Sequence, residues 1–286
     1  MNKTAVTIGK FEGLHLGHQL LLKEVSDVAE AKGYEAAFLK IRMPGQSIMT
    51  EEEERQFIQN EFPTIKHIVY YEFSPEFAAI TAEDFIKDIL IKKLNTAYLA
   101  VGNDFRFGSK RSGDVKLLES FGLENNYEVK VFDKLQIDGE TVSSTRIKKC
   151  LEAGDMEYAA KLLGHSFKLS GVVRGGKKLG RTLGYPTINL GLDVSKLLPG
   201  YGVYSSDVIL DGNKFRGITN IGIRPSIDDG EKPTVETFIY NFNDDIYGES
   251  VDIIPTRFIR PERRFDSLDD LTNQIELDIL DADRNQ

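Results

Sequence analysis

Two histidines stand three residues apart in the short segment FEGLHLGH, residues 11–18, which follows the apolar run TAVTIG, residues 4–9. The chain has four histidines, so half of them lie in this segment. The apolar run predicts a buried strand, and the spacing of apolar residues after Gly17 predicts a helix. A helix N-terminus offers unpaired N–H groups and a partial positive charge, which suit a phosphate group. We therefore expect His15 and His18 to donate hydrogen bonds to phosphate oxygens.

The chemistry that this segment suits is attack at the α-phosphate of a nucleotide. Gly13 and Gly17 would let a ligand approach the backbone closely. Two imidazoles could stabilise the negative charge that builds on the transferring group and on the departing pyrophosphate. The alternative is that His15 and His18 are ordinary polar residues at the start of a helix. The coincidence of the glycines with the end of a strand favours the phosphate site.

The segment VSSTRIKK, residues 142–149, opens a predicted helix with three residues typical of helix caps, Ser143, Ser144 and Thr145. Their hydroxyls and the guanidinium of Arg146 could reach triphosphate oxygens from the side opposite the histidines. Taken by itself, the segment also fits a simple helix cap.

A further segment, GVVRGGKKLGRTLGYPTINL, residues 171–190, combines glycines, cations and two oxygen-bearing side chains. A glycine loop with exposed N–H groups and cations can wrap a polyphosphate, although a solvated basic turn explains that part equally well. Thr187 and Asn189 stand two residues apart in a predicted strand, so both point to one face. Such a pair of oxygen ligands suits Mg²⁺, which keeps several of its waters.

Strands and helices alternate over the first 163 residues. Short apolar runs predict strands at 4–8, 35–41, 65–71, 97–101 and 127–132, and helical spacing predicts helices at 17–32, 50–62 and 82–94 and two short ones within 145–163. This order is typical of βαβ units, so we expect an α/β domain with a parallel sheet. The histidine segment then lies at the carboxyl end of the first strand, where open α/β sheets bind ligands.

The pattern changes near residue 166, where helical spacing gives way to short β-rich runs separated by Gly, Pro and Asp-Gly turns. These runs predict an antiparallel β-barrel. Residues 268–280 then predict a terminal amphipathic helix. We expect two domains, with bounds 1–163 and 164–286.

The composition limits the classes of partner. A net charge of −9 argues against a nonspecific nucleic-acid coat, although it leaves room for a local basic pocket. A single cysteine, Cys150, excludes an intrachain disulfide and favours a cytoplasmic setting. No apolar run approaches the roughly 18 residues that a spanning helix needs, and we see no signal peptide, so we expect no membrane association.

The motifs of the first half resemble a known family. The H-x-G-H pattern after a first strand resembles the nucleotidyltransferase superfamily, whose fold is Rossmann-like. The longer string resembles the G-x-F-D-G-x-H-x-G-H of bacterial bifunctional riboflavin kinase/FMN adenylyltransferases. VGNDFRFGSKRSGD, residues 101–114, is similar to that family's loop after a strand, and VSSTRIKK is similar to its S-S-T-x-I-R signature. Glu12 stands in place of an aspartate, Lys10 replaces a more common uncharged residue, and IRMPGQ, residues 41–46, lacks the histidine of the usual F-x-P-H-P-like turn.

The second half resembles the riboflavin kinase part of the same family. GRTLGYPTIN is similar to G-R-x-L-G-x-P-T-x-N, whose Thr and Asn bind MgATP in the family. TNIGIRPSI, residues 219–227, resembles N-x-G-x-R-P-T, and RPERRF resembles R-x-E-x-x-F. TVETFIYNFNDDIYGE, residues 234–249, resembles the strand with the catalytic glutamate. The resemblance implies that Glu236 is the general base for the terminal hydroxyl of riboflavin. From the residues alone, Glu236 could also be an acid on a strand face that is exposed to solvent.

The resemblance implies ATP-dependent phosphorylation of riboflavin to FMN, followed by adenylyl transfer from a second ATP to give FAD and pyrophosphate. Mg²⁺ would be the cofactor, and riboflavin, FMN, FAD and ATP the partners. Two alternatives stay open: a riboflavin kinase whose adenylyltransferase half is weakened at the IRMPGQ turn, and a non-catalytic flavin-binding sensor.

The resemblance also assigns site residues. For adenylyl transfer, it makes His15 and His18 catalytic, and the ATP-binding set comprises Gly9, Phe11, Gly13, His15, Gly17, His18, Ser143, Ser144, Thr145 and Arg146. The flavin contacts of that site are Asp104, Phe105 and Arg106. For the kinase, the ATP-binding set comprises Gly176, Lys177, Gly180, Arg181, Pro186, Thr187 and Asn189, with Thr187 and Asn189 on the metal. The flavin contacts of the kinase are Asn220, Arg224 and Arg260.

Overall fold

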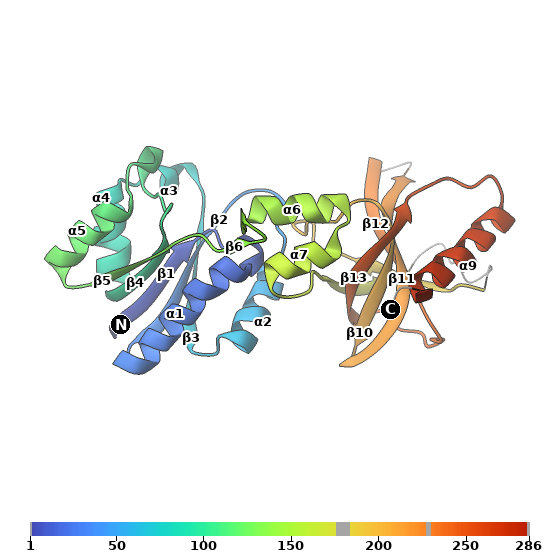
Figure 1. Cartoon of the computed structure of the whole chain (residues 1–286), viewed down its shortest axis with the longest axis horizontal. Helices are drawn as coiled ribbons and strands as arrows, with labels where there is room; N and C mark the ends of the chain where they lie inside the picture. Colours follow the sequence, from blue (N-terminus) through green and yellow to red (C-terminus); the bar gives the residue numbers. More distant parts are fainter. Residues whose placement is uncertain (1, 176–183, 227–229, 285–286) are drawn as a thin grey trace. The chain divides into compact units, whose positions relative to one another are not determined.

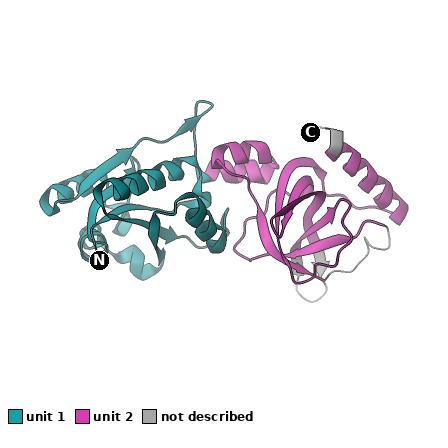
Figure 2. Ribbon diagram, turned by 90° about the horizontal axis from the view of Figure 1, so that it is seen from below, with its two compact units in different colours: residues 1–144 teal, residues 145–286 magenta. Residues whose placement is uncertain are grey.

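The computed structural model describes residues 2–175, 184–226 and 230–284. The chain divides into two compact units, residues 1–144 and 145–286 (Figure 2). Each unit has its own sheet or barrel and its own hydrophobic core, so each is described by itself.

The first unit is built on a parallel sheet with the strand order β3-β2-β1-β4-β5. Its strands are β1 (Thr4–Gly9), β2 (Glu35–Arg42), β3 (Ile65–Glu72), β4 (Thr96–Gly102) and β5 (Glu128–Phe132). Its helices are η1 (Glu12–Leu14), α1 (Leu16–Lys32), α2 (Glu51–Glu61), α3 (Pro75–Ala79), α4 (Ala82–Asp84), η2 (Phe85–Lys93), η3 (Ser109–Arg111) and α5 (Val115–Asn125). A short hairpin, β6 (Gln136–Ile137) and β7 (Glu140–Thr141), follows the sheet.

Helices lie on both faces of this sheet (Figure 1). On one face, Val6 and Ile8 of β1 pack with the buried apolar residues of η2 and α5. On the other face, α1 crosses β1, β2 and β4. Because both faces are covered, successive residues of the central strands are buried rather than alternately buried and exposed, as Thr4–Ile8 of β1 shows. The parallel α/β sheet that we expected is confirmed.

The helix ends follow from local sequence. In α2, the hydroxyl of Thr50 accepts from the backbone N–H of Glu53, and the carboxylate of Glu53 accepts from the N–H of Thr50, which forms a capping box. Helix α1 ends at Gly33, which has a left-handed φ of 67°. These caps fix where each helix starts and stops, and hence which side chains reach the carboxyl end of the sheet.

The short helix α6 (Ser144–Ala153) begins at the last residue of the first unit and continues into the second, where α7 (Met156–Leu163) follows it. The described strands of the second unit close into a barrel in the order β10-β11-β12-β9-β8-β13. They are β8 (Leu169–Arg174), β9 (Thr187–Gly191), β10 (Gly202–Leu210), β11 (Asn213–Ser226), β12 (Gly230–Ile239) and β13 (Ser250–Pro261). Thr219 and Thr237 are fully buried and hydrogen-bonded to each other at 2.9 Å. The antiparallel barrel that we expected is confirmed.

The terminal helix α9 (Leu268–Arg284) covers part of the barrel (Figure 1). It packs against β10, β11 and β13. Val203 and Ile218 of the barrel form a small apolar cluster there with Ala282 of the helix. The residues that alternate with Thr219 and Thr237 along the strands therefore face α9.

Several elements differ from the expectation. Helix α5, the one-turn helix α3 and the β6–β7 hairpin were not predicted, and the predicted helix 82–94 is mostly the π-helix η2. Backbone hydrogen bonds from Leu94 to Ile89 and from Asn95 to Ile91 close that helix. The π pattern depends on packing against the sheet, which the spacing of apolar residues does not reveal. Within the part of the chain that the structure describes, none of the helices has the length and apolar character to cross a bilayer.

We predict that Gly122→Ala lowers the stability of the first unit. Alanine normally stabilises a helix by about 1 kcal/mol relative to glycine. A Cβ at Gly122, in α5, would lie 2.6 Å from the carbonyl oxygen of Tyr127, so we expect a loss of about 1–3 kcal/mol instead. Hydrogen–deuterium exchange of α5 peptides measures the effect, and Ser120→Ala on the exposed side of the same helix is the control, which should be neutral or stabilising.

Candidate active sites

The two histidines of the first unit lie against each other at the start of α1. His15 is the N-cap residue, and its imidazole stacks on that of His18 with ring centroids 3.5 Å apart and an interplanar angle of 16°. Phe11 contacts His18 with a centroid distance of 4.8 Å and packs edge-on against Phe38 of β2. The spacing of three residues therefore places both imidazoles at the carboxyl end of β1, as expected from the sequence.

The loop between β1 and α1 has an unusual backbone. Phe11 and Leu14 have left-handed φ values of 47° and 42°, and Gly13 between them has a φ of 75°. A non-glycine residue in this region costs on the order of 1 kcal/mol or more, and such residues cluster at functional sites. A Cβ at Gly13 would approach the side chain of Ile48 to 3.0 Å, so this glycine is needed for space as well as for φ.

The electrostatic environment keeps His18 neutral. Burial lowers the pKa of its imidazole well below the usual value, and the neighbouring His15 and the cation of Lys40 lower the pKa further. A neutral imidazole donates one N–H. Among the described residues, Nδ1 of His18 is buried with no hydrogen-bond partner, so its hydrogen-bonding capacity is not used within the described structure.

The strand order puts the loop after β4 beside the histidine loop. In the order β3-β2-β1-β4-β5, the direction of winding reverses between β1 and β4, and ligands bind at such a switch point. The three residues predicted for flavin lie here. Asp104 pairs with Lys134 at 2.7 Å, Arg106 with Asp114 at 3.0 Å, and the ring of Phe105 stacks on Phe107 with centroids 5.5 Å apart.

The SSTR segment divides between the two units. Ser144 belongs to the first unit, and its hydroxyl donates to the carbonyl oxygen of Glu12 in the histidine loop at 3.1 Å. Thr145 and Arg146 belong to the second unit, where the guanidinium of Arg146 donates to the hydroxyl of Tyr158 in α7 and lies over its ring. The structure therefore brings Ser144 to the histidine loop, and it holds Arg146 on α7.

In the second unit, the polar candidates lie in one row across the barrel. Glu236 of β12 is paired with Asn189 of β9 on one side and with Asn220 of β11 on the other. The row continues through Val203 of β10 to Arg260 of β13. Thr187 is opposite Phe238 on the same face, two residues from Asn189, as predicted.

This face borders a pocket of about 290 Å³. Thr187, Asn220, Glu236 and Arg260 line it from the barrel. Its remaining walls are Tyr185, the barrel residues Val203, Ile218 and Phe238, and residues of α9 and of the segment before that helix. Polar groups from four strands thus converge on a cavity that also has apolar walls from both the barrel and α9, which is the usual form of a small-molecule site.

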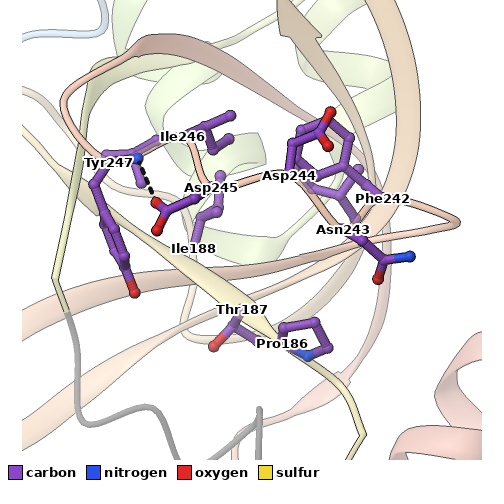
Figure 3. Close-up of a pocket in the computed structure, with 11 residues that line it drawn as sticks. Pro186, Thr187, Ile188, Phe242, Asn243, Asp244, Asp245, Ile246 and Tyr247 are labelled. Atoms are coloured by element: carbon purple, nitrogen blue, oxygen red, sulfur yellow. Dashed lines mark hydrogen bonds between the residues drawn. The ribbon is translucent and has the colours of Figure 1, made fainter.

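A second pocket of about 290 Å³ shares Thr187 with the first (Figure 3). Pro186 and the loop from Phe242 to Tyr247 line it, and the N–H of Tyr247 donates to the carboxylate of Asp245 at 3.3 Å. Thr187 therefore lies at the border between the two pockets.

Some predicted residues cannot be placed. Gly176, Lys177, Gly180 and Arg181 lie outside the described residues. Arg224 lies on β11, but its side chain is also outside what the structure describes. Within the described residues, no cluster of three His, Cys, Asp or Glu side chains could hold a metal ion.

Family models match both halves of the chain: an FAD synthetase model at residues 1–146 and a riboflavin kinase model at residues 163–285. A bifunctional riboflavin kinase/FMN adenylyltransferase from Buchnera aphidicola is 38% identical, over 97% of this chain and 92% of that protein. The chain belongs to the bifunctional riboflavin kinase/FMN adenylyltransferase family. The expected membership is confirmed, and the chain contains both an FAD synthetase and a riboflavin kinase domain.

Other relatives agree. Family members from Escherichia coli and Bacillus subtilis are 34% and 32% identical, over 97% and 99% of this chain and 91% and 92% of those proteins. The crystal structure of a macrolide-efflux protein from Streptococcus pneumoniae matches with a TM-score of 0.87 and 29% identity, over 100% of this chain and 95% of that one. The last similarity confirms the expected fold, a Rossmann-like unit followed by a barrel and a terminal helix.

One residue that the sequence reasoning missed on the kinase side is Asp278 of α9. It is 2% exposed and accepts three hydrogen bonds of 2.8 to 3.1 Å from the guanidinium of Arg260. The amide of Gln274 donates to the same carboxylate at 2.7 Å. A fork of this kind fixes the plane of the arginine. Periodicity marked α9 as amphipathic but gave no sign that one of its acids is buried.

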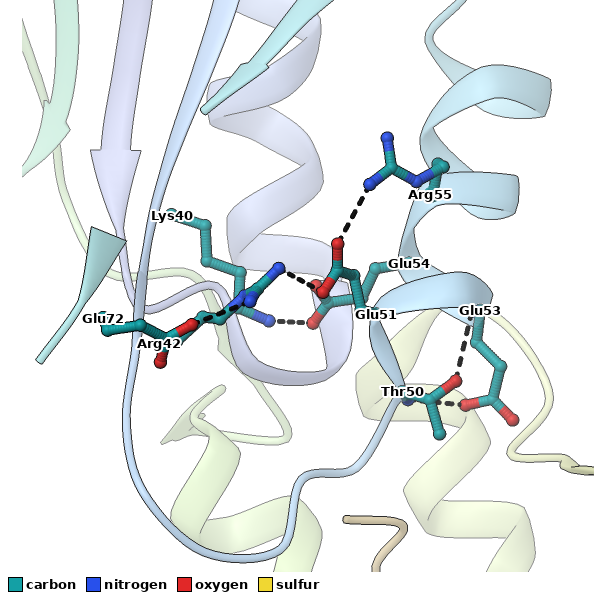
Figure 4. A network of polar contacts seen from close by, with 8 residues as sticks. All are labelled: Lys40, Arg42, Thr50, Glu51, Glu53, Glu54, Arg55 and Glu72. Atoms are coloured by element: carbon teal, nitrogen blue, oxygen red, sulfur yellow. Dashed lines mark hydrogen bonds and ion pairs between the residues drawn. The ribbon is translucent and has the colours of Figure 1, made fainter. Parts of the chain in front are cut away.

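On the adenylyltransferase side, the missed feature is a polar network that joins β2 to α2 (Figure 4). Its centre is a buried ion pair between Lys40 and Glu54. At its edge, Arg42 pairs with Glu51 and, at 2.7 Å, with Glu72. A visible signal existed, because Lys40 is a single cation within the apolar strand run EAAFLKI.

We predict that the burial of Glu54 makes the first unit less stable as the pH rises toward neutrality. Desolvation raises the pKa of Glu54 from 4.5 to about 7, although Lys40 opposes the shift. The folded state then binds more protons than the unfolded state between these two values. Stability is therefore greatest below pH 4.5 with respect to this group, falls as the pH rises from 4.5 through about 7, and levels off above that, with a total loss of up to about 3 kcal/mol.

The opening free energy of α2, from hydrogen–deuterium exchange corrected for intrinsic rates, measures this dependence. The double variant Lys40→Met with Glu54→Leu should have a flatter profile, since it has no charge in the buried position. Equal slopes in the wild type and the double variant between pH 5 and 7 would contradict the prediction.

Proposed function

We propose that the chain makes FAD from riboflavin in two steps at two separate ATP sites, one in each half. The barrel phosphorylates riboflavin to FMN, and the α/β half transfers AMP from a second ATP to FMN. The observation that carries this proposal is the double convergence of polar side chains: the stacked imidazoles at the β1/β4 switch point, and the row with Glu236 across the barrel. The proposed domain bounds remain 1–163 and 164–286.

In the kinase step, Glu236 would accept the proton of the terminal hydroxyl of riboflavin. That oxygen forms a bond to the γ-phosphorus of ATP, the bond from this phosphorus to the bridging oxygen breaks, and ADP leaves. The pairing of Glu236 with Asn189 and Asn220 supports this role, since Asn189 is proposed to contact MgATP and Asn220 is proposed to contact the flavin. Arg260, fixed by Asp278, would contact the flavin as a positioned guanidinium.

Mg²⁺ fits the same row. The hydroxyl of Thr187 and the side-chain oxygen of Asn189 are hard ligands on one face of β9, and no dedicated cage of acids is needed for an ion that keeps its waters. When bound, the ion would neutralise charge on the phosphates. The border position of Thr187 between the two pockets supports a phosphate of ATP there, with the adenosine on the side of Pro186. We also propose the contacts predicted from the sequence for five residues of the kinase half: ATP contacts for Gly176, Lys177, Gly180 and Arg181, and a flavin contact for Arg224.

In the adenylyltransferase step, a phosphate oxygen of FMN attacks the α-phosphorus of ATP, and pyrophosphate leaves. No proton must move at the histidines. Their task is to donate hydrogen bonds where charge develops, and the lowered pKa of His18 supports a neutral donor there. The glycines at 9, 13 and 17, together with Ser143, Ser144, Thr145 and Arg146, would contact the same ATP, with Asp104, Phe105 and Arg106 on the flavin side.

Neither alternative is favoured by the comparisons, because both family models match and the relatives at full coverage carry the bifunctional name. The use of ATP, riboflavin and FMN as substrates supports a cytoplasmic location, where these compounds are made. We propose no nucleic-acid or membrane partner.

We predict that His18→Ala lowers FAD formation by about 10²–10³-fold and leaves FMN formation unchanged, because a preorganised donor to the developing charge is lost in one half only. Chromatography of products from riboflavin and MgATP separates the two activities. His67→Ala is the matched control, since this histidine pairs with Glu35 at the other end of the sheet. Loss of both activities with the fold intact would contradict the assignment of two sites.

We predict the reverse for Glu236→Gln, which keeps the shape of the side chain but cannot accept the proton. FMN formation should fall by about 10²–10⁴-fold, and FAD formation from supplied FMN should be unchanged. Glu249→Gln, at an exposed acid beside β13, controls for a change of charge on the barrel. If Glu236→Gln forms FMN at the wild-type rate, the prediction is contradicted and another group must accept the proton.

A further inference from the structure

The two proposed reactions leave the buried Lys40–Glu54 pair unexplained. Lys40 is 7% exposed and Glu54 is 1% exposed, and the two side chains form an ion pair beneath α2 (Figure 4). Taking two charges out of water is costly, and apolar residues of similar size often stabilise a protein more. A charge that is kept in such a place marks a candidate functional residue.

The position of Lys40 ties it to the histidine loop. It is paired with Gly9, the last residue of β1, so its Cα lies beside the point where the loop begins. It shares a face of β2 with Phe38, two residues earlier, and Phe38 packs on Phe11, which contacts His18. The positive charge of Lys40 also lowers the pKa of His18. Lys40 and the imidazoles thus gather at the carboxyl ends of adjacent strands.

The pair is incompletely satisfied. Within the described residues, Oε2 of Glu54 is buried with no hydrogen-bond partner. The hydroxyl of Tyr70, which stands opposite Lys40 on β3, is likewise buried and unpaired there. A lysine has three N–H donors, and the described structure gives Lys40 one hydrogen bond, to Glu54. An anion that bound next to Lys40 could therefore accept hydrogen bonds from the N–H groups of its ammonium that Glu54 does not use.

We infer that Lys40 is a phosphate-binding residue of the adenylyltransferase site and that it exchanges Glu54 for a phosphate oxygen when substrate binds. The inference rests on the proposed function of that site. The phosphate belongs to ATP or to FMN, whose reacting groups must meet in front of the imidazoles. Glu54 is the counter-ion that holds the cation in place while the site is empty.

Glu54 can take up a proton when Lys40 leaves it. The charged and titratable groups around it are Lys40 and Arg42 from β2, Tyr70 from β3, and Glu51 in its own helix. Burial already raises the pKa of Glu54 to about 7, and loss of Lys40, which lowers that pKa, would raise it further. Binding of the phosphate should therefore be coupled to proton uptake at pH 7.5.

Calorimetric titration tests this coupling in the full-length chain. MgATP and FMN are each titrated at pH 7.5 into the wild type and into Lys40→Met, in two buffers of different ionisation enthalpy. The kinase half also binds these ligands, so its contribution cancels in the difference between the two proteins. We expect the wild type to take up more protons on ligand binding than Lys40→Met does. The ligand that causes this difference, MgATP or FMN, is the one whose phosphate contacts Lys40. Lys66→Met, at an exposed lysine on β3, should behave as the wild type.

Steady-state kinetics of FAD formation gives an independent readout. Lys40→Met should raise the KM of ATP or of FMN by about tenfold to one-hundredfold, as for one lost charge-assisted hydrogen bond. Lys40→Arg should restore part of it. Glu54→Gln should leave that KM unchanged or lower it, because the cation then has no competing anion. FMN formation should be unchanged in every variant.

Equal loss of FAD formation in Lys40→Met and Glu54→Gln, with unchanged KM values and no difference in proton uptake, would overturn the inference and leave a purely structural pair. If the single variants do not fold, the double variant Lys40→Met with Glu54→Leu replaces them. This double variant should fold, its KM for ATP or FMN in FAD formation should be raised, and it should take up fewer protons on ligand binding than the wild type. A double variant with the KM and the proton uptake of the wild type would overturn the inference. If the wild-type protein makes FMN but no FAD, the proposed function is contradicted. The calorimetric measurement of proton uptake would in that case still test whether Lys40 binds a phosphate.

Discussion

Backbone pairing between neighbouring strands sets the positions of the side chains that matter in both halves of this chain. In the barrel, the register of β9, β12 and β11 places Asn189, Glu236 and Asn220 in one row. In the parallel sheet, the register of β1 and β2 places Lys40 beside Gly9. A shift of one residue would turn every one of these side chains to the opposite face, so the hydrogen-bond ladders that stabilise the fold also determine the chemistry.

The two halves bring their polar side chains together in different ways. The α/β half collects its polar groups where strands end, at a switch point, and relies on a tight loop with left-handed residues to aim two imidazoles. The barrel collects its groups in one row across neighbouring strands and uses α9 to form part of the opposite wall. In each case an ion pair with a buried carboxylate lies at the site, Lys40 with Glu54 and Arg260 with Asp278, and it holds a cation near the place where phosphate or flavin is proposed to bind.

The burial of these pairs has different consequences. The carboxylate of Asp278 accepts several hydrogen bonds, which include a fork from Arg260, so the arginine is held in one plane. Glu54 has one oxygen in the pair and another that is buried and unpaired in the described structure, and burial raises the pKa of this carboxyl to about 7. The first pair is therefore suited to positioning, and the second is suited to exchange with a ligand.

The sequence by itself determined the type of each half, because the alternation of apolar runs and the spacing of turns are local properties. It also predicted His15, His18, Thr187, Asn189 and Glu236 as site residues, because their motifs are short stretches of sequence that resemble those of the family. It could not give the strand order that brings the loop after β4 next to the histidines, nor the partners of Lys40 and Arg260. Those contacts join residues 14 and 18 positions apart through different elements, and their formation depends on packing, which only the tertiary structure decides.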